Sequence, residues 1–421
     1  MKSMTKAFAA ALLALAAFRV AIMAWTPLFE PSETRYAAIS ANMARCGDWF
    51  APSFTYKGKY EIFAGKPPLV FQACGAACRT LGVNEFAVRL FPFASFAALL
   101  WLVWYSSRRG GARREEALLA TAVCASCTAL YATAGFCMTD MPLVCCVSGA
   151  LLLYAADGAR SLWSALAICA LLAAGMLVKG PVAVALFGLC VAVDFAFERV
   201  RTGRWPRIPA LNLAVGAALF AAICVPYFAL VEQRQPGFLR YFFINENLMR
   251  FLVHDYGDKY GAGRESFRGM AAIWALLVTL PWSLAPVVSL AKERRTLLKE
   301  SFALRSVCVI ALFWCLTSRV PPTYLLPVVP LFALHLATVW TRARDGRAAL
   351  LWKALPYAAA ISALALGGTL LATRITKPRK LPGAAAPQKI SDHYFSHEFY
   401  HGPWGEGNPF QAANERTPQQ P

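Results

Sequence analysis

Long apolar segments are the feature that most constrains how this chain can fold. About eleven segments are long and apolar enough to be candidate membrane-spanning helices, which need roughly 20 residues each. Their centres lie near residues 16, 96, 125, 147, 170, 188, 220, 279, 310, 332 and 361. Of the 421 residues, 58% are hydrophobic and only 15% are charged. The sequence therefore predicts an all-α integral membrane protein built as a multi-spanning bundle, and excludes an ordinary soluble domain.

Basic residues follow a pattern that orients this bundle. The chain begins with Lys2 and Lys6, and every second connecting segment after them is basic. These segments contain Arg108, Arg109, Arg113 and Arg114; Arg160; Arg199, Arg201, Arg204 and Arg207; Lys292, Arg294, Arg295 and Lys299; and Arg342, Arg344 and Arg347. Because short cytoplasmic loops collect lysine and arginine, we expect a cytoplasmic N-terminus in a bacterial inner membrane. The net charge of +19 then needs no nucleic-acid partner.

Two long segments, 26–85 and 232–267, are expected on the periplasmic side. In the first, Ser32 is predicted to cap a helix that continues to Ala44, with Glu33 in its first turn. Residues 238–251 form a second amphipathic segment. Both are predicted to be helices that lie on the membrane surface beside the transmembrane domain, residues 1–375. The tail, residues 376–421, is rich in Pro, Gly and Gln and is predicted to be poorly ordered.

Most of the 13 cysteines lie within apolar segments, where they are expected to serve as small packing residues. The Cys124-x-x-Cys127 pair has no second pair at metal-binding spacing. A disulfide among Cys46, Cys74 and Cys78 is left open.

Two carboxylates are candidates for acid–base chemistry at the membrane surface. Glu33 or Asp140 could accept a proton from an acceptor hydroxyl in a water-filled cavity. The alternatives are structural: Glu33 as a helix-cap partner or in a salt bridge with Arg35, and Asp140 as the cap of a helix whose first turn contains Pro142. For Asp140 both interpretations can hold together.

Cations near membrane depth indicate an anionic lipid headgroup. Lys66 and Lys179 precede proline and glycine-proline, so each turn would present an ammonium at the interface. A phosphate would be held by these charges with a guanidinium such as Arg250 or Arg319. Alternatively each lysine only reaches toward water from a helix end, and Tyr324 is only an interfacial aromatic residue.

Several segments in order resemble a known family. They are SETRYAAISANMARCGDWFAP, KPPLVFQACGAACRTLGVNEFAVRLFP, MTDMPL, LVKGPVAV, QPGFLRYFFINENLMRF and PPTYLLPVVP. This set resembles the polyprenyl-phosphate-dependent glycosyltransferases of the GT-C superfold, and most of all the bacterial branch that modifies lipid A with aminoarabinose, which is related to protein O-mannosyltransferases. The resemblance covers residues from about 10 to 340 and implies a GT-C bundle with amphipathic juxtamembrane helices and a cavity on the periplasmic face.

The resemblance also implies an activity and a set of residues. A sugar would move from an undecaprenyl-phosphate carrier to lipid A or another envelope glycolipid, with a protein acceptor as the alternative; a transporter or flippase for anionic lipids is the competing class. Motif by motif, the resemblance gives catalytic Glu33 and Asp140; donor-phosphate-binding Lys66, Lys179, Arg250 and Tyr324; and supporting Glu30, Arg35, Tyr36 and Arg319.

The chain departs from that branch at particular positions. Ser32 stands where the family has an Asp, which leaves Glu33 without its acidic neighbour. Gly65 replaces a carboxylate that the family associates with a bound metal ion, so no metal is predicted unless Glu61 substitutes, and the cofactor stays undetermined. His254, near Asp255 and Asp258, is weak evidence for a metal site. The basic residue before the proline-tyrosine motif, Arg319, is displaced by one position, and the segment after the last span is shorter than the family's C-terminal domain.

Overall fold

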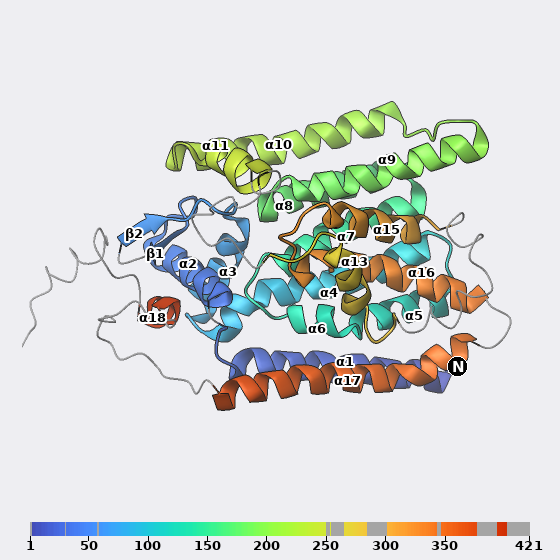
Figure 1. Ribbon diagram of the computed structural model, residues 1–421, viewed down its shortest axis with the longest axis horizontal. Helices are drawn as coiled ribbons and strands as arrows, with labels where there is room; N and C mark the ends of the chain where they lie inside the picture. The colour runs from blue at the N-terminus through green and yellow to red at the C-terminus, as the bar shows by residue number, and fades with distance from the viewer. Residues whose placement is uncertain are drawn as a thin grey trace, which may run out of the picture.

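The computed structural model describes residues 2–29, 31–56, 59–249, 253, 265–283, 301–342, 347–376 and 394–401. The chain forms a helical bundle with a smaller cap at one end, where α2, α3, α18 and a hairpin gather (Figure 1). The elements are α1 (Lys2–Trp25), α2 (Ser32–Cys46), β1 (Ser53–Tyr56), β2 (Lys59–Ile62), α3 (Leu69–Leu81), α4 (Glu85–Arg109), α5 (Arg114–Ala125), α6 (Thr128–Thr133), α7 (Asp140–Asp157), α8 (Leu162–Lys179), α9 (Val182–Thr202), α10 (Ala210–Arg234), α11 (Phe238–Arg240), the π-helix η1 (Tyr241–Met249), α13 (Met270–Val278), α15 (Phe302–Cys315), the 3₁₀ helix η2 (Pro322–Leu325), α16 (Val328–Arg342), α17 (Arg347–Thr376) and α18 (Tyr394–His401).

Helix α7 forms the centre of the bundle. Every residue from Asp140 to Tyr154 is buried, and the helix packs against α4, α8, α9 and α16. Helix α10 lies at one edge and α1 runs beside α17 at the other (Figure 1). Among the described residues, four helices are long and apolar enough to cross a membrane: α4, α7, α8 and α10. The larger number of spans expected from the sequence stays a prediction.

Two of the expected spans are interrupted. The apolar segment near residue 125 is divided into α5 and α6, and the segment near residue 279 ends its helix at Val278. The two interruptions meet: the Trp282 indole donates to the Ser126 hydroxyl at 2.9 Å, and the Thr128 amide donates to the Leu280 carbonyl at 3.1 Å. Non-helical backbone at membrane depth is tolerated where protein satisfies its polar groups, as it does here.

Helix α2 lies where the sequence predicted a helix, but its surroundings differ from those expected. Its residues Glu33, Thr34 and 36–43 are buried against α3, β1 and α18, so the apolar side that was expected to rest on the membrane surface packs against protein instead. Ser32 is the first residue of the helix and does not cap it. The Glu33 carboxylate instead accepts from the amide of Phe29, at 2.9 Å. After α2, the antiparallel strands β1 and β2 pair Ser53 with Ile62.

Helix α18 belongs to the tail that was predicted to be poorly ordered. The prediction fails for residues 394–401, because Phe399 is fully buried and Glu398 accepts hydrogen bonds from the Thr55 amide and from Asn42 at 2.9 and 2.7 Å. Arg45 donates to the Phe399 carbonyl at 2.7 Å, at the end of α18. The other tail residues, 377–393 and 402–421, lie outside the described residues.

All thirteen cysteines are free, and most are buried. The possible disulfide among Cys46, Cys74 and Cys78 is therefore not formed. Cys124 and Cys127 are fully buried and pack in the core, in agreement with their predicted role.

Candidate functional site

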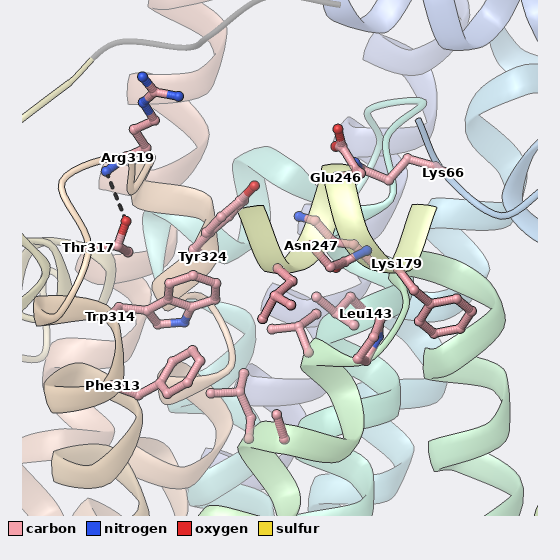
Figure 2. Close-up of a pocket in the computed structure, with 16 residues that line it drawn as sticks. Lys66, Leu143, Lys179, Glu246, Asn247, Phe313, Trp314, Thr317, Arg319 and Tyr324 are labelled. Atoms are coloured by element: carbon pink, nitrogen blue, oxygen red, sulfur yellow. Dashed lines mark hydrogen bonds and ion pairs between the residues drawn. The ribbon is translucent and has the colours of Figure 1, made fainter. Parts of the chain in front are cut away.

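A cavity of about 350 Å³ lies between the first turns of α9, the C-terminal end of α15, and η1 (Figure 2). It is lined by Lys66, Leu143, Lys179, Pro181, Val182, Ala185, Leu186, Phe243, Glu246, Asn247, Leu248, Phe313, Trp314, Thr317, Arg319 and Tyr324. Four of these residues, Lys66, Lys179, Arg319 and Tyr324, were selected from the sequence. The sequence analysis missed Glu246, Asn247 and Trp314 as cavity residues.

Lys179 is a buried cation of this cavity. It is the last residue of α8, and its ammonium donates to Asp140, the first residue of α7, at 2.8 Å. The same ammonium lies 4.2 Å from the centre of the Tyr324 ring, so the cation interacts with the face of the aromatic ring. Lys179 and Asp140 thus serve as partners, which neither sequence alternative had stated.

Gly180 explains why glycine follows Lys179. Its φ of +91° lies in the left-handed region, and a Cβ at this position would lie 2.5 Å from the ring of Phe242. The loop can therefore pass directly beneath η1 and bring Lys179 to the cavity wall.

Lys66 is paired with a residue of η1. Its ammonium forms an ion pair with Glu246 and also donates to the Gly65 carbonyl at 2.7 Å. Both side chains are largely buried, and Figure 2 shows them together on one side of the cavity. η1 is a nine-residue π-helix, a rare conformation that is enriched at functional sites. No pattern in the sequence predicted this geometry.

Arg319 lines the opposite side of the cavity, and its guanidinium lies 2.9 Å from the carboxylate of Glu265. Each of the three basic residues that line the cavity therefore has a carboxylate partner: Lys66 with Glu246, Lys179 with Asp140, and Arg319 with Glu265. An anionic ligand can bind the cations of this cavity only by sharing or displacing these carboxylates.

The remaining wall of the cavity is apolar. Leu143, Val182, Ala185 and Leu186 come from α7 and α9, and Trp314 packs against Tyr324 with ring centres 4.7 Å apart. A ligand that fits this wall and the cationic groups has a charged head and a hydrocarbon chain.

Glu33 lies elsewhere, in a buried ion pair with Arg89 of α4. Two carboxylate–guanidinium contacts measure 2.7 and 2.9 Å, and the amides of Phe29 and Cys137 donate to the same carboxylate at 2.9 and 3.1 Å. Glu33 is 2% exposed and is not among the described residues lining the cavity. This geometry favours the structural alternative, although the partner is Arg89 rather than Arg35. The sequence analysis did not select Arg89, although a charged residue inside an apolar helix is a signal that could have identified it.

Arg35 and Tyr36 pack against aromatic rings. The Arg35 guanidinium lies 5.6 Å from the centres of the Tyr36 and Phe63 rings. Tyr36 packs edge-on against Phe71 at 5.2 Å and is within electrostatic range of Lys179.

Five residues considered from the sequence lie outside the described residues: Glu30, Arg250, His254, Asp255 and Asp258. Among the residues that are described, no three His, Cys, Asp or Glu side chains gather as a metal site requires, and Glu61 joins no such group. We therefore derive no chemical step through a metal ion.

The helical bundle and its cationic, apolar cavity define the class: this is the GT-C fold of membrane glycosyltransferases. The chain belongs to the dolichyl-phosphate-mannose-protein mannosyltransferase family, whose sequence profile matches residues 7–242. The fold is similar to the crystal structure of ArnT from Cupriavidus metallidurans bound to undecaprenyl phosphate, with a TM-score of 0.73 at 19% identity, covering 99% of this chain and 88% of that one. The Archaeoglobus fulgidus oligosaccharyltransferase in the apo form gives 0.54 at 14% identity, covering 96% and 65%.

Curated relatives share the bundle. The undecaprenyl phosphate-alpha-4-amino-4-deoxy-L-arabinose arabinosyl transferase 1 of Pseudomonas fluorescens is 26% identical over 334 residues, which are 76% of this chain and 56% of the relative. The corresponding transferase of Aeromonas salmonicida is 29% identical over 328 residues, which are 74% and 56% of the two chains. This chain thus spans about half the length of the curated relatives that it matches. The predicted family and fold class are confirmed.

Proposed function

We propose that this protein transfers a sugar from an undecaprenyl-phosphate carrier to an acceptor on the periplasmic side of the bacterial inner membrane. One observation supports this most strongly. A single cavity combines Lys66, Lys179 and Tyr324 with an apolar wall, so it matches both the phosphate and the prenyl chain of such a donor.

In this proposal the donor phosphate binds at Lys66 and Lys179, with Arg250 as a further candidate. An acceptor oxygen attacks the anomeric carbon of the sugar while the bond from that carbon to the phosphate oxygen breaks. The polyprenyl phosphate leaves with the electron pair, and the two ammonium groups stabilise its developing charge. Since the cations are already in place, little reorganisation is needed when the charge develops.

Asp140 has two roles in the proposal. Its hydrogen bond to Lys179 fixes the ammonium at the cavity wall, and its carboxylate, one hydrogen bond behind that wall, is our candidate to orient the sugar or to accept the acceptor's proton. Glu33 supports the site from outside by fixing α2 to α4, and we no longer propose it as the base.

We propose lipid A or another envelope glycolipid as the acceptor and an aminoarabinose as the sugar, because the curated relatives are named as 4-amino-4-deoxy-L-arabinose transferases. A protein acceptor is the second candidate, since the matching family is named for protein mannosyltransferases.

Purified protein in detergent tests the activity. We expect it to release polyprenyl phosphate from a polyprenyl-phosphate-linked aminoarabinose when lipid A is added. A flippase would give no product without a sealed bilayer, so absence of product in detergent, together with movement of labelled donor across vesicles, would refute the proposed transferase.

A further inference from the structure

A second cavity, of about 460 Å³, lies at the far end of the helices that frame the first. Helices α7, α9 and α15 contribute to both cavities. At the first cavity they provide Leu143, Val182 and Trp314, and at the second Tyr154, Asp194 and Arg305. On α9 the first cavity is lined by residues between 182 and 186 and the second by residues between 194 and 202, so at the rise of an α-helix their centres lie roughly 20 Å apart along the bundle. The second cavity therefore lies at the opposite end of the bundle.

The carboxylates of this second cavity are already neutralised. Each carboxylate that lines it has an arginine partner: Asp194 with Arg305, Asp157 with Arg109, and Glu198 with Arg201. The Asp194–Arg305 pair lies deepest. The Asp194 carboxylate also accepts a hydrogen bond from the Tyr154 hydroxyl at 3.4 Å. These acids therefore leave no negative charge to balance further cations.

Three further arginines line the same cavity: Arg160, Arg204 and Arg207. All three side chains are exposed, and no carboxylate in the described part of the chain pairs with them. The backbone that carries them is held in place, because Asn212 donates to the Arg160 carbonyl at 2.7 Å and the Arg204 amide donates to Thr202 at 3.3 Å. The cavity thus presents three positive charges without a carboxylate partner in the described part of the chain, on two ordered connections, α7–α8 and α9–α10.

The rim of this cavity is apolar. Trp205, which also lines the cavity, is 62% exposed, and the neighbouring Val200, Leu211 and Leu213 are exposed as well. Exposed tryptophan is typical of the membrane–water interface, and apolar side chains beside it can contact acyl chains. A soluble phosphate would gain nothing from these groups.

We propose that this second cavity binds the phosphodiester headgroup of an anionic phospholipid at the basic end of the bundle. Arg160, Arg204 and Arg207 contact the phosphate, and the acyl chains lie along α9 and α10. This site is separate from the proposed donor cavity and does not depend on its function.

The alternative is that these arginines only set the orientation of the bundle in the membrane, as basic loop residues commonly do. A topological role depends on the number of charges, whereas a binding site depends on their position. The junction of α4 and α5 offers a matched control, because Arg108 at the end of α4, Arg113, and Arg114 at the start of α5 are exposed and do not line the second cavity.

The test measures the affinity for phosphatidylglycerol by native mass spectrometry of the titrated protein. It compares the triple variant Arg160→Gln/Arg204→Gln/Arg207→Gln with the control Arg108→Gln/Arg113→Gln/Arg114→Gln. Since each basic residue near an anionic surface contributes roughly a factor of five, we expect the first variant to bind the lipid roughly one hundredfold more weakly. The control should retain wild-type affinity. The three single variants are measured too, so that poor folding of the triple variant does not prevent a result.

Equal weakening in both triple variants, or in neither, would overturn the site. Titration with phosphatidylcholine should give weaker binding that does not differ between the variants. Displacement of phosphatidylglycerol by millimolar inorganic phosphate would assign the cavity to a soluble phosphate and would overturn the lipid proposal.

Discussion

Lys66 is positioned for a ligand phosphate by its carbonyl contact and by Glu246. We expect Lys66→Ala to reduce sugar transfer at least about one hundredfold, since loss of one preorganised group that stabilises developing charge typically has this effect. The rate of sugar transfer is measured as turnover of a polyprenyl-phosphate-linked sugar in detergent.

Because Lys66→Ala leaves Glu246 buried without that partner, the matched control is Lys66→Ala/Glu246→Gln. This double variant should recover thermal stability and stay inactive. Wild-type turnover in either protein would remove Lys66 from the mechanism.

Glu246 competes with the donor phosphate for the same ammonium. Glu246→Gln should therefore bind undecaprenyl phosphate more tightly, by roughly tenfold, equivalent to about 1.4 kcal/mol. Isothermal titration in detergent measures the affinity. Weaker binding would show instead that Glu246 holds Lys66 in its binding position.

The Glu33–Arg89 pair is a stability determinant. Removing one partner of a buried pair typically costs about 3–5 kcal/mol, because the other charge is left uncompensated. Glu33→Gln should therefore lower the thermal unfolding midpoint clearly, and Glu33→Leu/Arg89→Leu should recover part of the loss. A fully stable Glu33→Gln protein without activity would return Glu33 to the list of catalytic candidates.

Helix α18 is held in place by the Glu398 carboxylate, whose surroundings shift its pKa. Burial raises the pKa of Glu398 from 4.5 to about 7, although hydrogen bonds from Thr55 and Asn42 and the charge of Arg45 oppose the rise. A raised pKa means that the docked helix binds the proton more tightly than the undocked one. Docking of α18 is therefore strongest below about pH 4.5 and weakens as the pH rises to about 7. Above that value it stays constant, and the total change in the free energy of docking is about 3 kcal/mol.

Hydrogen exchange of residues 394–401 checks this pH dependence. We expect faster exchange, after correction for the intrinsic rate, at pH 8 than at pH 5. Glu398→Gln should remove the difference and keep the contact with the Thr55 amide. A pH-independent wild-type protein would contradict the proposed titration of Glu398.

The elements differ in how far the sequence could predict them. Helices such as α4 and α7 follow from apolar length, and the position of α2 follows from its polar start. The break between α5 and α6 could not be seen, because the residues that satisfy its backbone, such as Leu280 and Trp282, are distant in sequence. The burial of α2 depends on contacts with α3 and α18, which local periodicity does not report.

For the site as well, local sequence indicated single residues, whereas their contacts depend on the tertiary fold. Lys179 and Asp140 could be selected because charge beside apolar segments is rare, but their pairing requires the tertiary fold. Glu33 was selected for the same reason, but local sequence could not show its ion pair with Arg89, which is 56 residues away. Charge pattern thus identified some of the residues of interest, whereas their partners, such as Glu246 and Arg89, became evident only from the tertiary fold.

For the molecule as a whole, the proposed activity predicts a change in the cell envelope. Mass spectrometry of envelope glycolipids and glycoproteins, with and without this protein, should show one component that loses an aminopentose. Loss from a glycoprotein alone would favour the protein acceptor, and unchanged masses under conditions of expression would contradict the proposed function.

The docking of α18 also bears on how this protein is made. Asn42 and Thr55 are bonded to Glu398, which follows them by 356 and 343 residues. Bringing such distant segments together is slow, because much of the chain's loop entropy is lost before the contact forms. The loop that contains Asn42 and Thr55 therefore reaches its final structure only after the ribosome has released α18, and until then its buried polar groups must be satisfied by water or by a chaperone.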